Sequence, residues 1–451
     1  MFRLAVMMSA FAVIGSAADT SSSTPTVTFN KDVLPILARN CQSCHRPGEI
    51  GPMSFLTYEG TRPWAKAIRL AVLSRKMPPW FAEAPAGHFA NDRRLSDADI
   101  ETLAAWVDSG AIEGDPKDKP APVQWKEGLN IQPDVAIEMP AAFDIPAAGV
   151  LDYTYFLAPV HFKEDTWVTA GEFRPGARGN VHHAIIFVRP PGSTWMKDIQ
   201  PGVPYVPKNQ YINGAKAKPL PTDANEWLVA YVPGMNPLRF DAENSAKLIP
   251  AASDLIFEMH YTTNGKATQD RSKVGLVLAK TLPAKRFIEL AGAASQGIMI
   301  PPGDPNYEGR AVYKFNVAAD LIEQQAHMHL RGKDMLTTLT YPTGETQTVL
   351  DVPLYNFYWQ LVYYDSQPIH ITPGTIIEVK GHWDNSANNK NNPDPAATVS
   401  WGEQSSDEMM VDHFGVVVEK SVDVRHILSP VKDETTDGAK SAPLADQQAR
   451  R

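Results

Sequence analysis

Cysteine is nearly absent from this chain of 451 residues, and its two cysteines, Cys41 and Cys44, stand three positions apart. A disulfide framework, which stabilises many secreted domains, is therefore excluded, and these two thiols are available for another use. Long apolar runs are also missing. No stretch reaches the roughly 20 apolar residues that a helix needs to cross a bilayer, so we expect no transmembrane segment.

Blocks of lysine and arginine are absent too, and the net charge is −9. Nothing in the charge pattern favours nucleic acid or an anionic membrane surface as a partner. What is abundant is proline: 38 residues, among only short apolar runs, argue against a mainly helical protein. The length suggests about three domains, and we expect a multidomain chain that is mostly β-strand.

The N-terminus is typical of a secretory signal peptide over residues 1–18. Arg3 supplies the positive charge, residues 4–15 form a short apolar core, and Ser16-Ala17-Ala18 offers small residues for cleavage. We therefore expect a periplasmic or secreted protein.

The two cysteines belong to the motif Cys41-x-x-Cys44-His45, which follows a stretch with helical spacing of apolar residues and with Asn30 as its expected N-cap. This spacing attaches a c-type haem: both thiols bond the porphyrin and the histidine binds the iron. A reduced cysteine pair or half of a zinc site is the alternative. Zinc would need two further ligands nearby, and thioredoxin-like motifs lack this helical setting.

The second axial ligand of such a haem should follow some tens of residues later. Met77 is our choice, because Pro78 and Pro79 stiffen the backbone that must hold a weak thioether ligand. Met53 and His88 remain alternatives for this position.

Two further helices are expected around this motif, over residues 61–74 and from Ser96 to Gly110, with Asp99 completing a capping-box-like start. With the haem motif and this helix order, residues 26–115 resemble a small all-α class I cytochrome c domain. Residues 116–125 are the expected linker.

From residue 123 onward, short β-rich segments alternate with proline and glycine. Residues 153–157, 254–261 and 375–380 are among the expected strands. About three hundred residues of this kind suggest two all-β sandwich domains, 126–282 and 283–430, followed by a disordered polar tail over 431–451.

Several histidines have spacings that suit metal binding. His327 and His329 lie two apart on an expected strand and so point to the same face. His182 and His183 are adjacent, so one metal could bind both only at a strand start or a bulge. The alternative places one of them in the core and the other in solvent. His260 stands alone on a strand, where a hydrogen-bonded histidine is the default reading.

Met409 lies in a later segment, Glu408-Met409-Met410. A thioether added to imidazoles selects copper, because soft sulfur stabilises Cu(I), although two methionines in a strand would ordinarily be core. The remaining histidines without partner spacing are expected to be ordinary hydrogen-bonded residues: His161, His370, His382 and His426.

The order of these motifs over residues 150–420 resembles the copper type II ascorbate-dependent monooxygenases, the family of peptidylglycine α-hydroxylating monooxygenase and dopamine β-monooxygenase. The resemblance implies two copper ions on two jelly-roll-like sandwich domains, facing each other across a water-filled cleft. It assigns one copper, the electron store, to His182, His183 and His260. The other copper, where dioxygen reacts, is assigned to His327, His329 and Met409.

The chain departs from that family at several places. No cysteine is left for the disulfides of its animal members, and His413 stands four residues after the copper methionine, where those enzymes have tyrosine. Gln325 replaces the arginine that grips a substrate carboxylate in the peptide-amidating branch, which disfavours a peptidyl-glycine substrate. Glu258, two residues before His260, makes this strand resemble the catecholamine branch more closely.

Together these patterns predict an exported monooxygenase that hydroxylates a C–H bond of a small organic substrate with dioxygen. Two electrons are needed per turnover, and the haem would pass them from an external donor to the copper sites. Two rivals remain open: an electron-transfer or copper-handling module without hydroxylase activity, and a haem-bearing binding module whose sandwiches have lost copper.

Overall fold

The computed structural model describes residues 26–85, 88–126, 128–160, 162–206, 226–294, 297–402 and 404–431. The predicted signal peptide, and all but the first residue of the predicted tail, lie outside these residues. The described chain is mostly β-strand with few helices, as the sequence predicts. Among the residues just given, no helix combines the length and apolarity needed to cross a membrane.

The α-helices all lie in the N-terminal part, which we call the helical segment (residues 26–118). Ser96 begins the last α-helix as expected, accepting a hydrogen bond from the Asp99 amide at 3.1 Å. The prediction of Asn30 as an N-cap was wrong. Asn30 is buried inside η1, where its side-chain amide donates to the carbonyls of Gly114 and Asp115. The helices of this segment are η1 Phe29–Val33, α1 Leu34–Asn40, α2 Tyr58–Thr61, η2 Arg62–Trp64, α3 Ala65–Leu73, α4 Asp97–Asp108 and η3 Pro116–Asp118. Two short helices, η4 Ala242–Asn244 and η5 Val424–His426, lie among the strands.

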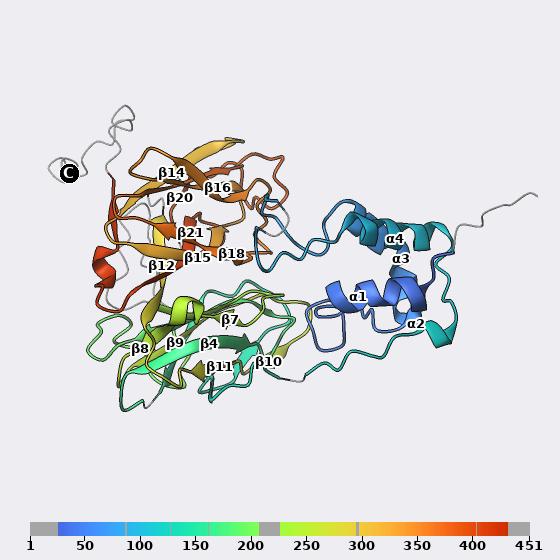
Figure 1. Ribbon diagram of the computed structural model, residues 1–451, viewed down its shortest axis with the longest axis horizontal. Coiled ribbons are helices and arrows are strands. Elements are labelled where there is room, and N and C mark those ends of the chain that lie inside the picture. The colour runs from blue at the N-terminus through green and yellow to red at the C-terminus, as the bar shows by residue number, and fades with distance from the viewer. Residues whose placement is uncertain are drawn as a thin grey trace, which may run out of the picture.

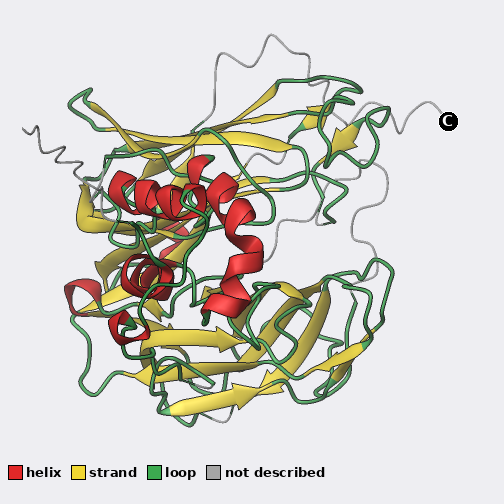
Figure 2. Cartoon of the chain, turned by 90° about the vertical axis from the view of Figure 1, so that its right-hand side faces the viewer, coloured by secondary structure: helices red, strands yellow, loops and turns green. Residues whose placement is uncertain are grey.

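The helical segment has an apolar core of its own. Phe29, Leu37, Leu103 and Trp106 are fully buried in it, and the indole of Trp106 donates to the carbonyl of Ile112 at 2.9 Å. Figure 2 shows these helices gathered beside the sheets. The helices and the haem motif fit a class I cytochrome c, and that assignment stays a prediction.

Two sheets packed face to face, which we call the first sheet pair, follow the helical segment. Strands β3, β9, β5 and β6 form one sheet, and β1, β11, β4 and β8 form the other, with β7 paired to β4. Phe156, Ile186 and Leu276 are among the buried side chains between them. The strands are β1 Val135–Glu138, β2 Phe143–Ile145, β3 Thr154–Pro159, β4 Thr166–Arg174, β5 Val181–Arg189, β6 Glu226–Tyr231, β7 Leu238–Arg239, β8 Ser245–Ile249, β9 Asp254–Tyr261, β10 Thr268–Asp270 and β11 Lys273–Leu278.

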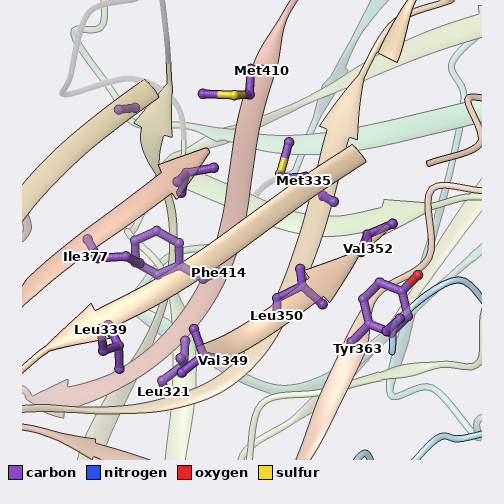
Figure 3. Close-up of a cluster of buried hydrophobic side chains, with 14 of the residues drawn as sticks. Leu321, Met335, Leu339, Val349, Leu350, Val352, Tyr363, Ile377, Met410 and Phe414 are labelled. Atoms are coloured by element: carbon purple, nitrogen blue, oxygen red, sulfur yellow. The ribbon is translucent and has the colours of Figure 1, made fainter. Parts of the chain in front are cut away.

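The second sheet pair has the same layered form. Strands β17, β16, β19, β14 and β22 make one sheet, and β12, β21, β15 and β18 make the other. Figure 3 shows the apolar side chains between them, including Leu321, Leu339 and Phe414. The strands are β12 Lys285–Ala294, β13 Met299–Ile300, β14 Tyr307–Phe315, β15 Ala319–Met328, β16 Gly332–Thr340, β17 Thr346–Val352, β18 Tyr363–Ile371, β19 Ile376–Trp383, β20 Val399–Ser400, β21 Met410–Glu419 and β22 Leu428–Pro430.

One sheet runs through both pairs. Strand β8 of the first pair lies parallel to β12 of the second, with Lys285 opposite Ser245 and Arg286 opposite Ala246, and this contact makes a nine-stranded sheet. The ring of Phe287, from β12, is buried in the core of the first pair. The predicted boundary at residues 282/283 falls just before β12, and the two pairs are joined there by hydrogen bonds and by shared core.

The helical segment contacts both sheet pairs (Figure 1). Residues 80–85 and 88–91, which we call the docking segment, extend from it onto the second pair. Trp80 and Phe89 pack against Tyr363 with ring centroids 5.0 and 5.4 Å away, and the Ala90 amide donates to the Tyr364 carbonyl at 2.8 Å. On the other side, Glu49 forms ion pairs with Arg174 and Arg178 of the first pair.

Candidate functional site

A β-bulge in strand β5 brings three histidines together. Val181 pairs with Tyr261 and His183 pairs with His260, so His182 has no partner in the ladder. A bulge lets two successive side chains turn to the same side, which is the condition that the sequence set for this pair. The ligand atoms of the three histidines lie within 4.8 Å of one another, and we call this group the first histidine cluster.

The first histidine cluster fits a metal ion by its geometry. The Nδ1 atoms of His182 and His183 are 3.0 Å apart, which matches two nitrogens that each bind one metal at about 2.0–2.1 Å. His182 Nε2 and His260 Nδ1 are buried without a hydrogen-bond partner among the described residues. The phenol ring of Tyr153 stacks on His260 with centroids 4.6 Å apart.

Its electrostatics also suit a metal. Burial lowers the pKa of His182 to about 4 and that of His260 to about 3, and it holds the pKa of His183 well below its usual range. All three rings are therefore neutral at neutral pH, and neutral imidazole is the form that binds metals.

His327 and His329, at the end of β15, form a second histidine pair with ring centroids 5.2 Å apart. His327 Nδ1 bonds the side-chain oxygen of Gln360 at 2.7 Å, and His329 Nδ1 bonds the carbonyl oxygen of Asp407 at 3.2 Å. Both acceptors require a proton on Nδ1, so each ring is left with an unprotonated Nε2. His329 Nε2 is buried and has no partner among the described residues.

Glu408 holds the turn that carries His329. Its carboxyl group accepts from the amides of His329 at 3.0 Å and Arg331 at 2.6 Å, and from the indole of Trp383 at 2.9 Å. Burial raises the pKa of Glu408 to about 8, although these donors pull it down. Glu408 therefore positions His329 of the second histidine pair by holding the backbone that carries it.

The predicted third ligand, Met409, precedes strand β21. Met410 pairs with Met328, and its sulfur lies in the core of the second sheet pair (Figure 3). Since strand side chains alternate, Met409 faces away from that core. Continuing the register by one residue places it opposite His329, on the face that carries both histidines. Its role as a ligand stays a prediction.

His413 lies close to the second histidine pair. Its ring centroid is 5.9 Å from that of His327 and 4.1 Å from that of Trp227, to which it is tilted by 31°, and its Nδ1 is buried without a partner among the described residues. Burial, with the nearby His327, holds the pKa of His413 well below its usual range. A further neutral imidazole therefore stands where the resembling family has tyrosine.

The two histidine groups adjoin each other across one ring. Phe357, which is buried, stacks on His182 with centroids 5.0 Å apart and lies 6.4 Å from His329. Burial and, secondarily, His327 lower the pKa of His182, so charge on one group is felt by the other. The resemblance implies a water-filled cleft between the sites, and in the structure a buried phenyl ring lies beside one histidine of each group.

The haem motif lies on the turn after α1. The amides of Cys44 and His45 both donate to the Cys41 carbonyl, so one turn carries both thiols and the histidine. The His45 ring stacks on Phe55 at 4.5 Å, and its Nδ1 is buried without a partner among the described residues. Burial, with the neighbouring Cys44, raises the pKa of Cys41 to about 12, so this thiol is protonated at neutral pH while it has no bonded partner.

The three residues predicted as possible second axial ligands lie in different surroundings. Met77 is half-buried at the turn after α3, and Met53 packs against the core of the helical segment. Burial lowers the pKa of His45, and the Met53 carbonyl partly offsets this effect. His88 lies instead in the docking segment, where its Nε2 is 3.7 Å from Asp365 Oδ1. Met77 stays our prediction.

Three of the four histidines expected to be ordinary have carboxylate partners. His370 bonds Asp320 at 2.9 Å and His382 bonds Asp334 at 2.6 Å, while His426 lies 3.4 Å from Asp423. These rings are accounted for without a metal. His161 lies outside the described residues.

Several contacting residues could not be found from the sequence. Gln360, Phe357, Tyr153 and Trp227 belong to no short motif, and they reach the histidines only through the fold. The one signal available was the aromatic run Phe357-Tyr358-Trp359 within a short interval between strands.

Comparisons with known proteins add no family. No family model matches the chain, and no curated protein sequence matches it. Among solved structures, the chain is similar to the infectious bursal disease virus Gx strain structure at 10% identity, covering 65% of this chain and 75% of that one, with a TM-score of 0.18. The VP2 subviral particle structure of the same virus is similar at 10% identity, covering 66% of this chain and 74% of that one, with a TM-score of 0.16. Scores this low carry no argument about fold or function.

Proposed function

We propose that the chain is an exported copper-dependent monooxygenase, related to the ascorbate-dependent copper type II family by its motifs. In this proposal each sheet pair is a jelly-roll-like copper domain, and the helical segment is a fused class I cytochrome c. The reaction would insert one oxygen atom of dioxygen into a C–H bond of a small organic substrate and release the other as water.

The observation that carries the proposal is the pairing of two unlike histidine sites beside a haem motif. The first cluster offers three imidazoles, and the second offers two whose Nδ1 atoms are engaged by Gln360 and Asp407. Three imidazoles suit a one-electron copper store, whereas two imidazoles with a thioether from Met409 favour Cu(I) and leave a position for dioxygen. His260 Nδ1 and His329 Nε2, which are buried without a hydrogen-bond partner among the described residues, are available to these ions.

Copper bound at these sites would supply one-electron redox chemistry and the activation of dioxygen, and haem c would supply electrons. The protein's own residues do the positioning. Gln360 and the Asp407 carbonyl fix which ring nitrogens face the metal. Glu408 holds the turn at His329, and the buried ring of Phe357 lies beside a histidine of each site.

The substrate side of the proposal follows from Gln325. Its side-chain amide is buried and donates to the Gln360 carbonyl at 2.8 Å, so it supports the loop behind His327. The side chain at this position is therefore an uncharged amide, where the peptide-amidating branch has an arginine. We therefore propose a small substrate that has no carboxylate group to be bound at this position. A peptidyl-glycine substrate does not meet this condition.

The test begins with the purified full-length protein, whose copper and haem are counted before substrates are screened under oxygen. We expect two copper ions and one haem per chain, and oxygen uptake that matches the formation of a hydroxylated product. Oxygen uptake without such a product would favour the electron-transfer module, and absence of copper would favour the haem-bearing binding module.

A matched variant then tests the assigned site. In the loaded protein the reduced haem should be reoxidised by oxygen more slowly in His327→Ala than in the parent. His370→Ala, which removes an exposed histidine paired with Asp320, should leave the rate unchanged. Equal rates in parent and His327→Ala would sink the proposed electron route.

A further inference from the structure

We propose that the five-residue loop 356–360, which we call the aromatic loop, is the bridge that carries electrons from the haem to the copper sites. This inference rests on the proposed function and adds to it the residues of the route. Trp359 would receive the electron at the edge of the haem, and Phe357 would deliver it between the two histidine groups.

The haem end of the route is set at Gly234, which follows β6. A Cβ atom added there would lie 3.8 Å from Cys44 Sγ and 3.9 Å from Cζ3 of Trp359. The haem-bonding sulfur and the indole ring thus border the same point of the backbone. Gly234 has φ +83°, and its carbonyl accepts from Arg93 of the helical segment at 3.0 Å, which pins this approach.

The copper end of the route is Phe357. Its ring stacks on His182 at 5.0 Å and lies 6.4 Å from His329, so one side chain reaches a ligand of each site. Tyr358 adds a second contact, 5.4 Å from Phe357 and 6.1 Å from His182. The aromatic loop thus has Trp359 near Gly234 and Cys44 at one end, and Phe357 and Tyr358 beside His182 at the other.

The loop between these ends is held in place by hydrogen bonds. Asn356 accepts from the amides of Tyr358 and Trp359 at 3.0 and 2.9 Å. Gln360 donates to the Phe357 carbonyl at 3.1 Å and also bonds His327 at 2.7 Å. The same loop thus fixes one histidine of the second pair, stacks on the first cluster and borders the haem motif.

The electron balance is simple. Each transfer oxidises the haem iron from Fe(II) to Fe(III) and reduces one copper from Cu(II) to Cu(I), and the aromatic side chains end unchanged. Two transfers support one hydroxylation, whose two protons come from solvent, and the external donor reduces the haem after each. The contribution of the rings would be to shorten the through-space steps between the haem and the copper sites.

The test is a single-transfer measurement on the full-length protein loaded with haem and Cu(II). Without oxygen or substrate, the haem is reduced by a light pulse with a ruthenium photosensitiser, and its reoxidation by copper is followed from its absorbance. Trp359→Leu and Phe357→Leu remove one ring each, whereas Trp359→Phe keeps a ring. Trp167→Leu is the matched control, since Trp167 is a half-buried tryptophan of β4, in the other sheet of the first pair.

We expect Trp359→Leu and Phe357→Leu to slow haem reoxidation at least tenfold, with Trp359→Phe and Trp167→Leu within about threefold of the parent. The haem potential and the copper EPR spectra should be unchanged in all four. A loaded Trp359→Leu protein with the parent rate would overturn the bridge alone, as would a slower rate that comes with shifted potentials or spectra. A parent protein that takes up no copper or no haem would instead overturn the proposed function.

Discussion

The neighbours of each histidine decide which ring nitrogen is available. Gln360 can only accept with its side-chain oxygen, so it places the proton of His327 on Nδ1 and turns Nε2 outward. The Asp407 carbonyl does the same for His329. A substitution at Gln360 should therefore change metal binding by His327 without changing metal binding by the first histidine cluster.

We expect Gln360→Leu to weaken copper binding at the second site by about 10–100-fold, the usual cost of losing such a supporting hydrogen bond. Binding at His182, His183 and His260 should be unchanged, which a two-site copper titration resolves. Gln347→Leu, which removes only a partner of Tyr341 on the β16–β17 hairpin, is the control. An equal loss of copper affinity at both sites would mean that Gln360 acts by holding the loop in place and not by fixing the tautomer of His327.

A buried carboxyl group makes the stability depend on pH. Asp365 of β18 has a side chain only 3% exposed, and burial raises its pKa from 3.8 to about 8. Between about pH 4 and pH 8 the folded chain therefore binds a proton that the unfolded chain has lost. The contribution of this group to stability therefore falls as the pH rises through that window, by up to about 1.4 kcal/mol per unit.

Asp365→Asn removes this proton without changing the shape of the side chain. We expect the variant to lose less stability than the parent between pH 5 and pH 7.5, measured from denaturant midpoints at the two pH values. The exposed Asp198 offers a control, because Asp198→Asn should keep the parent's pH dependence. A parallel loss in parent and Asp365→Asn would show that this carboxyl group titrates normally.

At the scale of the element, alternation along a strand separates packing from function. Met410 is fully buried in the core of the second sheet pair, and Met409 faces the opposite way. The same alternation makes His327 and His329 share a face, which the sequence alone could predict. The bulge of β5 has the opposite effect, because it breaks alternation to unite His182 with His183.

Substitutions at the two methionines should have different effects, one on stability and the other on copper binding. Met410→Ala should lower the free energy of unfolding by about 2–5 kcal/mol, the usual cost of emptying a packed core position, without loss of copper. Met409→Leu should keep the stability but weaken Cu(I) binding at the second site, measured by competition with a Cu(I) chelator. If Met409→Leu binds Cu(I) as the parent does, Met409 is no ligand.

At the scale of the molecule, the helical segment and the two sheet pairs form one connected body. The nine-stranded sheet joins the pairs through β8 and β12, and the docking segment inserts Trp80 and Phe89 into the core of the second pair. Glu49 ties the haem side to the first pair through Arg174 and Arg178. The place of the haem motif beside the aromatic loop depends on these attachments.

Removing the ring of Phe89 from the docking segment should show how much this attachment contributes to stability. Phe89→Ala should cost about 3–5 kcal/mol of stability, because Phe89 is 3% exposed and packs on Trp80 and Tyr363. Trp64→Ala, at a tryptophan that is 42% exposed, should change stability by no more than about 0.5 kcal/mol. Denaturant unfolding compares the two, and similar small effects would show that the docking segment is not bound tightly.

Much of this protein was determined by local sequence. The Ser96 cap, the strands at 254–261 and 375–380, and the shared face of His327 and His329 follow from periods of 3.6 and 2 and from capping chemistry. These patterns involve residues a few positions apart, so one chain suffices to read them. Asn30 shows the limit, since its hydrogen bonds go to carbonyls more than eighty residues away.

Only the tertiary structure decided how those pieces meet. The bulge that unites His182 with His183 depends on pairing with β9, and the nearness of Phe357 to both histidine groups depends on packing between the sheet pairs. Cys44 and Trp359 both lie beside Gly234, because two distant segments meet there. Such contacts join residues with no spacing rule between them, so the sequence could supply the ligands but not the route that connects them.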